Sequence, residues 1–286
     1  IMDAAGNTVT SATNQVTITI GNNPSGGLLI GTTVRNAVGG VATFNNLQIN
    51  NAGDGYTLQA SAAGFTGATS ASFNLLSPFV VRNTNDAGPG SFRNAITKSN
   101  QTTGAQTISF NLPGAGPHRI EPITAFPAVS DPLTIDATTQ PGFSGTPIIE
   151  LTGNNRVGVP VGLDLRSGNN TIKGLSINRF YGAAIVISSA MTGGNTIQAN
   201  YIGTNTAGDT ALPNGIGIVI GTPNNLIGGS TASERNLISG NQGSGIQIGL
   251  VPNAGAATGN VVVGNLIGTD AAGTAPLPNN SGIIIV

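Results

Sequence analysis

Two stretches with the same pattern of residues occur in this sequence, one in its middle and one at its end. The first, GNTIQANYIGTNTAGDTALPNGIGIVI, covers 194–220, and the second, GNVVVGNLIGTDAAGTAPLPNNSGIIIV, covers 259–286. A related unit lies between them and another precedes them, and the units begin at Asn170, Asn195, Asn225 and Asn260. Self-similarity with a period of about 20–50 residues is typical of folds in which each unit stacks on its neighbour.

Each unit holds three short β segments separated by Gly or Asn. These residues tolerate left-handed backbone conformations, so they allow sharp bends between strands. Three strands joined by bends, rather than by reversals, form one turn of a helix with parallel strands. We therefore predict an all-β chain with a right-handed parallel β-helix over 77–286 and clear coils from residue 161 onward. The insert 204–214, which recurs as 269–279, should project from one corner on every second coil.

Stacked coils place equivalent residues in ladders. We expect inward-facing ladders of branched aliphatic side chains, whose χ1 angles are already restricted. One ladder would contain Ile172, Ile197, Ile227 and Val262. A second would contain Ile185, Ile218, Ile246 and Ile283, and a third, beside the second, would contain Ile187, Ile220, Ile248 and Ile285. A polar ladder of Asn170, Asn195, Asn225 and Asn260 should occupy a corner, each side-chain amide bonding the next.

Residues 1–76 follow a different pattern. Short alternating segments such as NQVTITIG and VATFNNLQI (41–49) are separated by Gly/Asn turns, which predicts an immunoglobulin-like β-sandwich. Tyr56 has the sequence context of a tyrosine corner. The chain begins IMDAAGNTV, without the pattern of a signal peptide, so we expect a fragment of a longer protein whose first strand is truncated.

One amphipathic helix is predicted between these regions, over about 90–99. Ser91 or Gly90 can cap it, and Phe92, Ala95 and Ile96 share one face. A helix in this position would cover the first coil of the β-helix and hide its exposed edge.

Both regions resemble bacterial surface proteins. The run GVATFNNLQINNAGDGYTLQA (40–60) is similar to bacterial immunoglobulin-like modules, and 79–286 resembles secreted right-handed β-helix proteins with pectin-lyase-like repeats. The resemblance implies an extracellular or cell-surface location. It does not select a function, because this architecture serves lyases, hydrolases and adhesins alike.

Composition excludes several other classes. Only 7% of residues are charged and the net charge is −1, with no basic patch, so we expect no nucleic-acid partner. No apolar run approaches the roughly 20 residues of a membrane span, so we expect no membrane insertion. Cys is absent, which removes disulfides, thiolate nucleophiles and Cys-ligated zinc.

Candidates for chemistry are few. Asp136, Glu150 and Asp164 recur at equal intervals, a spacing that permits a carboxylate pair on neighbouring coils, although isolated solvent-facing acids explain them better. Asp270 is the candidate for a Ca²⁺ ligand, but the sister insert has Asn205 there and one carboxylate is too few. We therefore expect no cofactor.

Two further groups are weaker candidates. His118, with Arg119 and Glu121 close by, lacks the serine that a catalytic triad needs. Phe180 and Tyr181 offer either a sugar-stacking platform or aromatic cover for a corner of the core.

These observations favour a non-enzymatic structural or adhesive segment of an exported bacterial protein. The β-helix would be a stiff rod, the immunoglobulin-like module a spacer, and the partners other copies, joined through uncapped ends into a filament, or further modules of the same chain. The alternative is a carbohydrate-binding or polysaccharide-degrading β-helix with a groove along one sheet.

Overall fold

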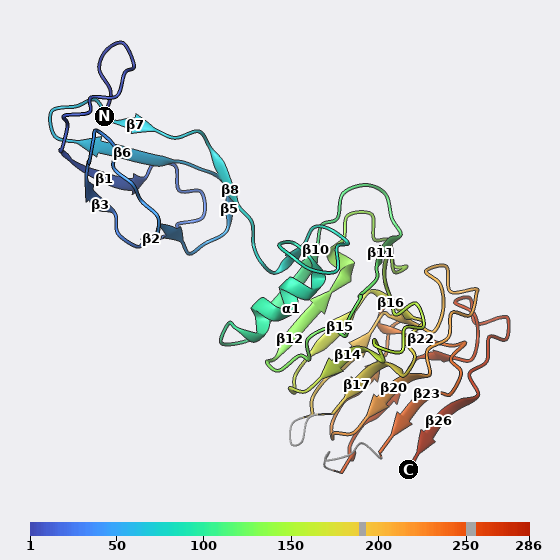
Figure 1. Cartoon of the computed structure of the whole chain (residues 1–286). Helices are drawn as coiled ribbons and strands as arrows, with labels where there is room; N and C mark the ends of the chain where they lie inside the picture. The colour runs from blue at the N-terminus through green and yellow to red at the C-terminus, as the bar shows by residue number, and fades with distance from the viewer. Residues whose placement is uncertain (189–192, 250–255) are drawn as a thin grey trace. The chain divides into compact units, whose positions relative to one another are not determined.

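The structure, a computed structural model, describes residues 1–188, 193–249 and 256–286. The chain divides into two compact units, Ile1–Ser77 and Pro78–Val286, and each is described by itself (Figure 1). In the described residues no helix is long and apolar enough to cross a membrane.

The first unit is built from antiparallel strands. One sheet has the order β3-β1-β6-β7, and two pairs, β2–β4 and β5–β8, accompany it. The strands are β1 (Gln15–Ile20), β2 (Leu29–Ile30), β3 (Val34–Asn36), β4 (Gln48–Ile49), β5 (Gly53–Tyr56), β6 (Leu58–Ala62), β7 (Ala68–Thr69) and β8 (Phe73–Leu75). The strand predicted over 41–49 is shorter than expected, because only its end forms β4.

Tyr56 anchors the interior of the first unit. Its side chain is fully buried, its ring stacks on Phe73 with centroids 6.2 Å apart, and its hydroxyl donates to the Asn51 carbonyl at 3.1 Å. A buried tyrosine that bonds the backbone a few residues upstream is the arrangement expected of a tyrosine corner.

The strands of the second unit form three parallel sheets in its described part. Sheet 1 has the order β24-β21-β18-β15-β12-β10-β9, sheet 2 the order β11-β13-β16-β19-β22-β25, and sheet 3 the order β14-β17-β20-β23-β26. Sheet 1 contains β9 (Val80–Val81), β10 (Gln106–Phe110), β12 (Leu133–Asp136), β15 (Thr171–Lys173), β18 (Thr196–Gln198), β21 (Leu226–Gly228) and β24 (Val261–Val263). Sheet 2 contains β11 (His118–Ile120), β13 (Ile149–Thr152), β16 (Leu175–Asn178), β19 (Tyr201–Ile202), β22 (Leu237–Ile238) and β25 (Leu266–Ile267). Sheet 3 contains β14 (Val161–Leu165), β17 (Ala183–Ile187), β20 (Ile216–Ile220), β23 (Ser244–Ile248) and β26 (Ser281–Ile285).

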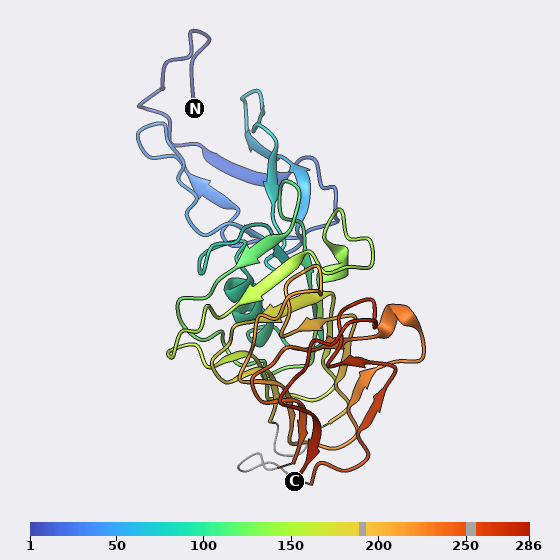
Figure 2. The same cartoon turned by 90° about the vertical axis from the view of Figure 1, so that its right-hand side faces the viewer.

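The chain passes through the three sheets in turn. From β12 onward it visits sheet 1, then sheet 2, then sheet 3, and repeats this order to β26. Each circuit lies beside the next, as the two views show (Figures 1 and 2). Two short 3₁₀ turns, Ala137–Thr139 and Ala232–Glu234, lie in the connections. This topology is compatible with a parallel β-helix, and one circuit is called a coil below.

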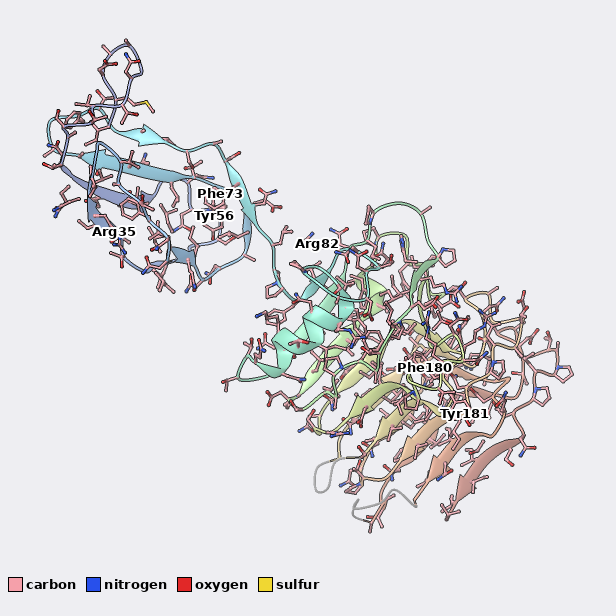
Figure 3. All side chains as sticks on the ribbon, in the orientation of Figure 1. Arg35, Tyr56, Phe73, Arg82, Phe180 and Tyr181 are labelled. Atoms are coloured by element: carbon pink, nitrogen blue, oxygen red, sulfur yellow. The ribbon has the colours of Figure 1, made fainter. Side chains whose placement is uncertain are left out.

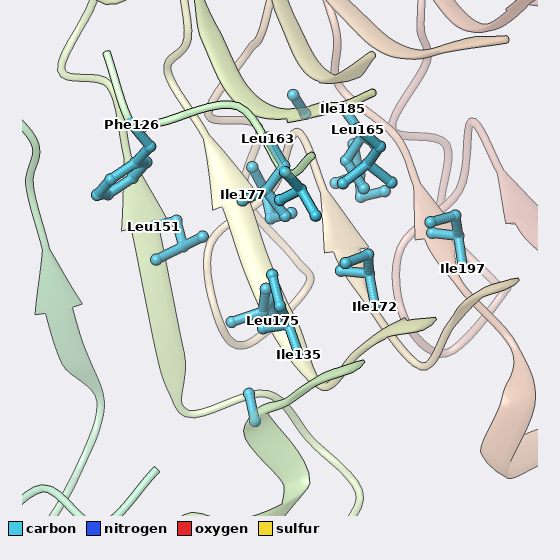
Figure 4. Packing of buried hydrophobic residues seen from close by; sticks show 14 of the residues in the cluster. Phe126, Ile135, Leu151, Leu163, Leu165, Ile172, Leu175, Ile177, Ile185 and Ile197 are labelled. Carbon is cyan, nitrogen blue, oxygen red and sulfur yellow. The ribbon is translucent and has the colours of Figure 1, made fainter. Parts of the chain in front are cut away.

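Aliphatic ladders fill the interior. Ile172 pairs in register with Ile197, Ile197 with Ile227, and Ile227 with Val262. In sheet 3, Ile185, Ile218, Ile246 and Ile283 are in register, as are Ile187, Ile220, Ile248 and Ile285. Sheet 2 adds a ladder that was not predicted, formed by Leu151, Ile177, Ile202, Ile238 and Ile267. Figure 4 shows several of these side chains converging in the core.

Exposure changes along the ladders. Ile185, Ile218 and Ile246 are completely buried, whereas Ile283 is 45% exposed. Ile283 belongs to β26, at the edge of sheet 3, so a neighbouring strand covers one side of it only.

Helix α1 (Phe92–Asn100) lies at one end of the second unit, beside β10 (Figure 1). The Ser91 hydroxyl caps it by accepting from the Asn94 N–H at 3.2 Å, as expected of an N-cap serine. Phe92, Ala95 and Ile96 are completely buried and belong to the same hydrophobic cluster as the ladders.

Candidate functional site

The three acids that the sequence offers as a catalytic group lie in one coil, on three different sheets. Asp136 ends β12 in sheet 1, Glu150 lies in β13 in sheet 2, and Asp164 lies in β14 in sheet 3. Each is half-buried between two buried neighbours, so its side chain is on the outer side of its strand. The hypothesis that places these acids on neighbouring coils is therefore wrong: the interval between them corresponds to one side of a coil.

Each of these carboxylates has a partner of its own. Lys173 Nζ lies 2.9 Å from Asp136 Oδ2, Asn178 Nδ2 donates to Glu150 Oε1 at 2.8 Å, and Arg166 Nε donates to Asp164 Oδ2 at 2.8 Å. A two-carboxylate mechanism needs both acids on one reacting bond, about 5–9.5 Å apart. Carboxylates on the outer sides of three different sheets do not converge on one bond.

Asp270 stabilises a turn in the second insert. Its Oδ1 accepts from the N–H groups of Thr274 at 2.8 Å and Ala275 at 3.1 Å. In the first insert Asn205 Oδ1 accepts from Gly208 at 2.8 Å and Asp209 at 3.2 Å. The exchange of Asn for Asp between the inserts is thus explained, because either side chain supplies the accepting oxygen. No group of three metal-ligating acids, His or Cys occurs in the described residues.

Replacing Asp270 with Asn should leave the turn intact at neutral pH and change its acid sensitivity. The Ala275 and Thr274 N–H groups hold the pKa of Asp270 below its ordinary value of 3.8. The carboxylate therefore stabilises the turn above that value, and the stabilisation is lost as the pH falls through the lowered pKa. NMR temperature coefficients of the Thr274 and Ala275 amides, followed from about pH 6 into increasingly acid solution, should show weakening in the parent chain once the carboxyl is protonated and none in Asp270→Asn. Equal acid weakening in both chains would contradict this assignment.

The two aromatic candidates separate. Phe180 is completely buried in the core, whereas Tyr181 is 63% exposed (Figure 3). Phe180 is thus not available to a ligand. His118 is buried and its Nε2 lies 3.2 Å from Gln140 Nε2, so it belongs to a corner of the core, while Arg119 pairs with Glu121 at 3.4 Å.

The inserts lie back on sheet 2. They leave the coil after sheet 2 on every second coil, as predicted, but Ala271 N–H of the second insert donates to Gly208 O of the first at 2.9 Å. Leu237 belongs to the coil between them, on the outward row of sheet 2, and is nevertheless 1% exposed. A Cβ added at Gly208 would lie 2.8 Å from both Leu237 and Tyr201. The inserts therefore cover outward apolar residues instead of projecting freely.

A patch of buried polar residues lies on sheet 2, and the start of the first insert contacts part of it. Thr152, Ser176 and Asn178 are outward-facing and completely buried. Ser176 Oγ donates to Thr204 O at 3.1 Å and Asn178 Nδ2 donates to the same oxygen at 3.0 Å. Thr152 Oγ1 and Asn178 Oδ1 have no hydrogen-bond partner in the described residues.

We expect Thr152→Val to raise the free energy of unfolding by about 1–2 kcal/mol, because it removes a buried hydroxyl without a partner while keeping the shape of the side chain. The matched change Ser176→Ala removes a hydroxyl that has a partner and should lower it by about 1 kcal/mol. Urea unfolding of the three chains checks both signs. A loss of stability in Thr152→Val would show that this hydroxyl is hydrogen-bonded in solution.

Buried asparagines connect the coils. The Nδ2 groups of Asn170, Asn195 and Asn225 donate to Oδ1 of the next member at 2.7, 2.7 and 2.8 Å, ending at Asn260. The backbone N–H of each donor residue reaches the same oxygen at 3.0, 3.0 and 2.9 Å. The structure thus has the amide ladder that the sequence placed at one corner.

Two further ladders occupy the other corners of the described coils. Asn200, Asn236 and Asn265 form one, with Nδ2–Oδ1 distances of 3.1 and 2.9 Å. Asn214, Asn241 and Asn279 form the other, with distances of 2.9 and 2.8 Å. The signal for both was in the sequence, since the first set precedes YI, LI and LI and the second precedes the third strand of each coil. The connections between the strands differ in length from coil to coil, so the asparagines of each set do not recur at a fixed interval in the sequence. Their common register is therefore hard to recognise from the sequence.

The outer faces of these coils therefore show no converging catalytic group in the described residues, and the polar side chains with the most complete hydrogen bonding are the corner asparagines. In comparison with known proteins, no family matches the sequence and no curated protein matches it.

Proposed function

We propose that this chain is a structural segment of an exported bacterial surface or extracellular-fibre protein. The second unit would be a right-handed β-helical rod, and the first unit an immunoglobulin-like spacer. The observation that supports this proposal is the set of asparagine ladders at all three corners, which link the three successive coils that begin at Asn195, Asn225 and Asn260 through side-chain amides. Buried amides fully paired between repeats resist both sliding and separation of the coils.

A rod of this kind needs cover at the end of its core, and α1 suits that role. Arg93 ties the helix to the segment that follows β11: Nη2 donates to Thr124 O at 2.6 Å, Nη1 donates to Ala125 O at 2.6 Å, and Nη2 pairs with Asp86 at 2.7 Å. Burial raises the pKa of Asp86, but the hydrogen bonds from Arg93 and Ile123 N–H outweigh it and leave this pKa below its ordinary value.

We expect Arg93→Ala to lower the free energy of unfolding by about 2–3 kcal/mol, since it removes the ion pair with the Asp86 carboxylate and the donors to the carbonyls of Asp86, Thr124 and Ala125. Local opening should appear as faster hydrogen exchange in β9 and β10, next to the helix. Arg35→Ala is the control, because Arg35 is exposed and forms no ion pair in the described residues. Equal effects of the two substitutions would show that Arg93 does not hold the helix.

Force spectroscopy tests the rod directly. A stack of coils should lengthen in steps of one coil, about 9–13 nm for 25–35 residues. One cooperative extension of the whole second unit would contradict the proposal. So would cleavage of a polysaccharide, with or without Ca²⁺, that is abolished by Asp136→Asn or Asp164→Asn.

A carbohydrate-binding role is the second candidate, and Tyr181 favours it. Its ring is 63% exposed. Arg179 lies two positions earlier in the sequence, and no hydrogen bond or ion pair involves its guanidinium in the described residues. An exposed aromatic face suits a sugar ring. Loss of binding to a polysaccharide panel in Tyr181→Ala would support this role, and absence of binding by the parent chain would end it.

A further inference from the structure

The side chain of Gln140 connects the two ends of the segment between β10 and β11. It is almost completely buried and follows the first 3₁₀ turn, so it belongs to the next coil. Gln140 Oε1 accepts from the N–H of Leu112 at 2.8 Å, and Nε2 donates to the Leu112 carbonyl at 3.0 Å. The same Nε2 lies 3.2 Å from His118 Nε2. Leu112 follows β10 and His118 begins β11, so one amide holds both ends of residues 112–118.

The backbone of Leu112 fixes the direction of this amide. A flipped amide would turn its nitrogen toward the Leu112 N–H and its oxygen toward the Leu112 carbonyl, and both hydrogen bonds would be lost. Gln140 Nε2 therefore faces His118 as a donor, and His118 Nε2 has to accept. An imidazole nitrogen accepts only when it carries no proton, so in this contact the ring is neutral and its proton is on Nδ1.

A protonated His118 is incompatible with this contact. Histidine ordinarily changes its charge between about pH 5 and pH 8. A charged ring would turn a second N–H toward the N–H of the amide, and neither group could accept. Rotation of the amide gives no relief, because it sacrifices both bonds to Leu112. Acid therefore removes the hydrogen bond between Gln140 and His118 and leaves a buried donor facing another donor.

No carboxylate on the neighbouring elements compensates for a charge on this ring. The segments that contact His118, 111–117 and 140–148, contain no charged residue. The ionisable side chains on the adjoining strands and turn, none of which bonds to His118 in the described residues, are Arg119, Glu121, Glu150 and Asp136. The first three lie on the outer side of sheet 2, and Asp136 pairs with Lys173.

We propose that His118 and Gln140 form an acid-sensitive clasp on the segment between β10 and β11. At neutral pH the uncharged ring accepts the amide N–H, and residues 112–118 are held at both ends. When histidine becomes charged, the His118 end is released and the segment opens more often. The stabilisation is thus present above the pH range in which histidine titrates and is lost as the pH falls through it. The proposal does not depend on the rod function.

The experiment uses the 286-residue chain, whose single histidine identifies its own imidazole signals in a ¹⁵N NMR spectrum. At about pH 7 we expect an unprotonated Nε2 and a protonated Nδ1 in the folded chain. At about pH 5 most carboxylates are still ionised, so a change between the two values reports mainly on histidine. Hydrogen exchange of the Leu112 amide, corrected for its intrinsic pH dependence, should be about fivefold faster at the lower pH.

Two variants separate His118 from the rest of the chain. His118→Gln offers a carbonyl acceptor that does not titrate, and should remove the acid response of the Leu112 amide. Arg119→Gln changes the exposed neighbour in the same strand and should keep the response of the parent chain.

Three results would each overturn the proposal. The first is a proton on His118 Nε2 in the folded parent chain at about pH 7. The second is equal protection of the Leu112 amide at both pH values. The third is a full acid response in folded His118→Gln, because another group would then be responsible. If His118→Gln does not fold, the two measurements on the parent chain decide the question.

Discussion

Replacing Asn195 with alanine should lower the free energy of unfolding by about 3–5 kcal/mol, a large effect for one substitution. Asn195 is completely buried, and its Oδ1 accepts both the N–H and the Nδ2 of Asn170, at 3.0 and 2.7 Å. Its own Nδ2 donates to Asn225 at 2.7 Å. Alanine would leave the N–H and Nδ2 of Asn170 without this acceptor and would remove one of the two donors to Asn225 Oδ1, and buried groups without partners are costly. Urea unfolding measures the change.

Two further variants sharpen this test. Asn195→Asp keeps the accepting oxygens but loses the donor and buries a charge, so it should also destabilise, and less so at acid pH where the carboxyl is protonated. Asn280→Ala is the matched control, because Asn280 is exposed and its side chain forms no hydrogen bond in the described residues. Its effect should stay within about 0.5 kcal/mol. A loss below about 1 kcal/mol in Asn195→Ala would mean that the ladder contributes no more than an average hydrogen bond.

Gly203→Ala should be the second large effect, about 3–4 kcal/mol, when tested against Gly268→Ala. The two glycines hold equivalent positions in the repeat, and both have left-handed φ values, 94° and 80°. A Cβ at Gly203 would collide with Ser239 O and Asn241 Oδ1 of the next coil, whereas a Cβ at Gly268 would come no closer than 3.9 Å to Pro278. Backbone conformation is thus matched between the two sites, and stacking against the next coil is not.

The difference between the two glycine variants isolates the cost of disturbing that stacking. We expect Gly268→Ala to lower the free energy of unfolding by about 1–2 kcal/mol, for the left-handed conformation alone. The additional loss in Gly203→Ala should be about 2 kcal/mol. Thermal unfolding of both variants, followed by circular dichroism, provides the comparison. Equal losses would show that the next coil does not press on Gly203 in solution.

The repeat predicts the core of the second unit well because registration is set by the ladder residues themselves. Ile172, Ile197 and Ile227 are spaced irregularly in the sequence, yet each follows an asparagine by two positions. That local offset is fixed by the corner, so variable connections elsewhere in the coil do not disturb it. The sequence alone therefore identifies these contacts, because the offset from the asparagine sets the register and the lengths of the loops do not affect it.

The same reasoning fails where a spacing must be converted into a place on the coil. Asp136, Glu150 and Asp164 are equally spaced in the sequence. Long connections lengthen the coil that contains them, so the spacing between two of these acids spans the distance to the next sheet of the same coil and not the distance to the next coil. The role of the inserts could not be predicted either. Only the structure shows that Leu237 faces outward and needs the cover that they provide.

The first unit shows a different limit. The alternation in 41–49 predicts a strand, and alternation reports which faces are buried, not whether another strand is present to pair with the backbone. Residues 42–45 keep the alternation and lack the partner.

The central claim is that the repeated unit is one coil of a stack. Nuclear Overhauser contacts between isoleucine δ1 methyl groups test it most directly. Parallel in-register coils put equivalent residues about 4.8 Å apart and alternate coils about twice as far. We predict cross-peaks between Ile172 and Ile197, between Ile197 and Ile227, and between Ile218 and Ile246, following the register of the strands. Absence of the first two contacts from the spectrum of the folded chain would contradict the stacked-coil account.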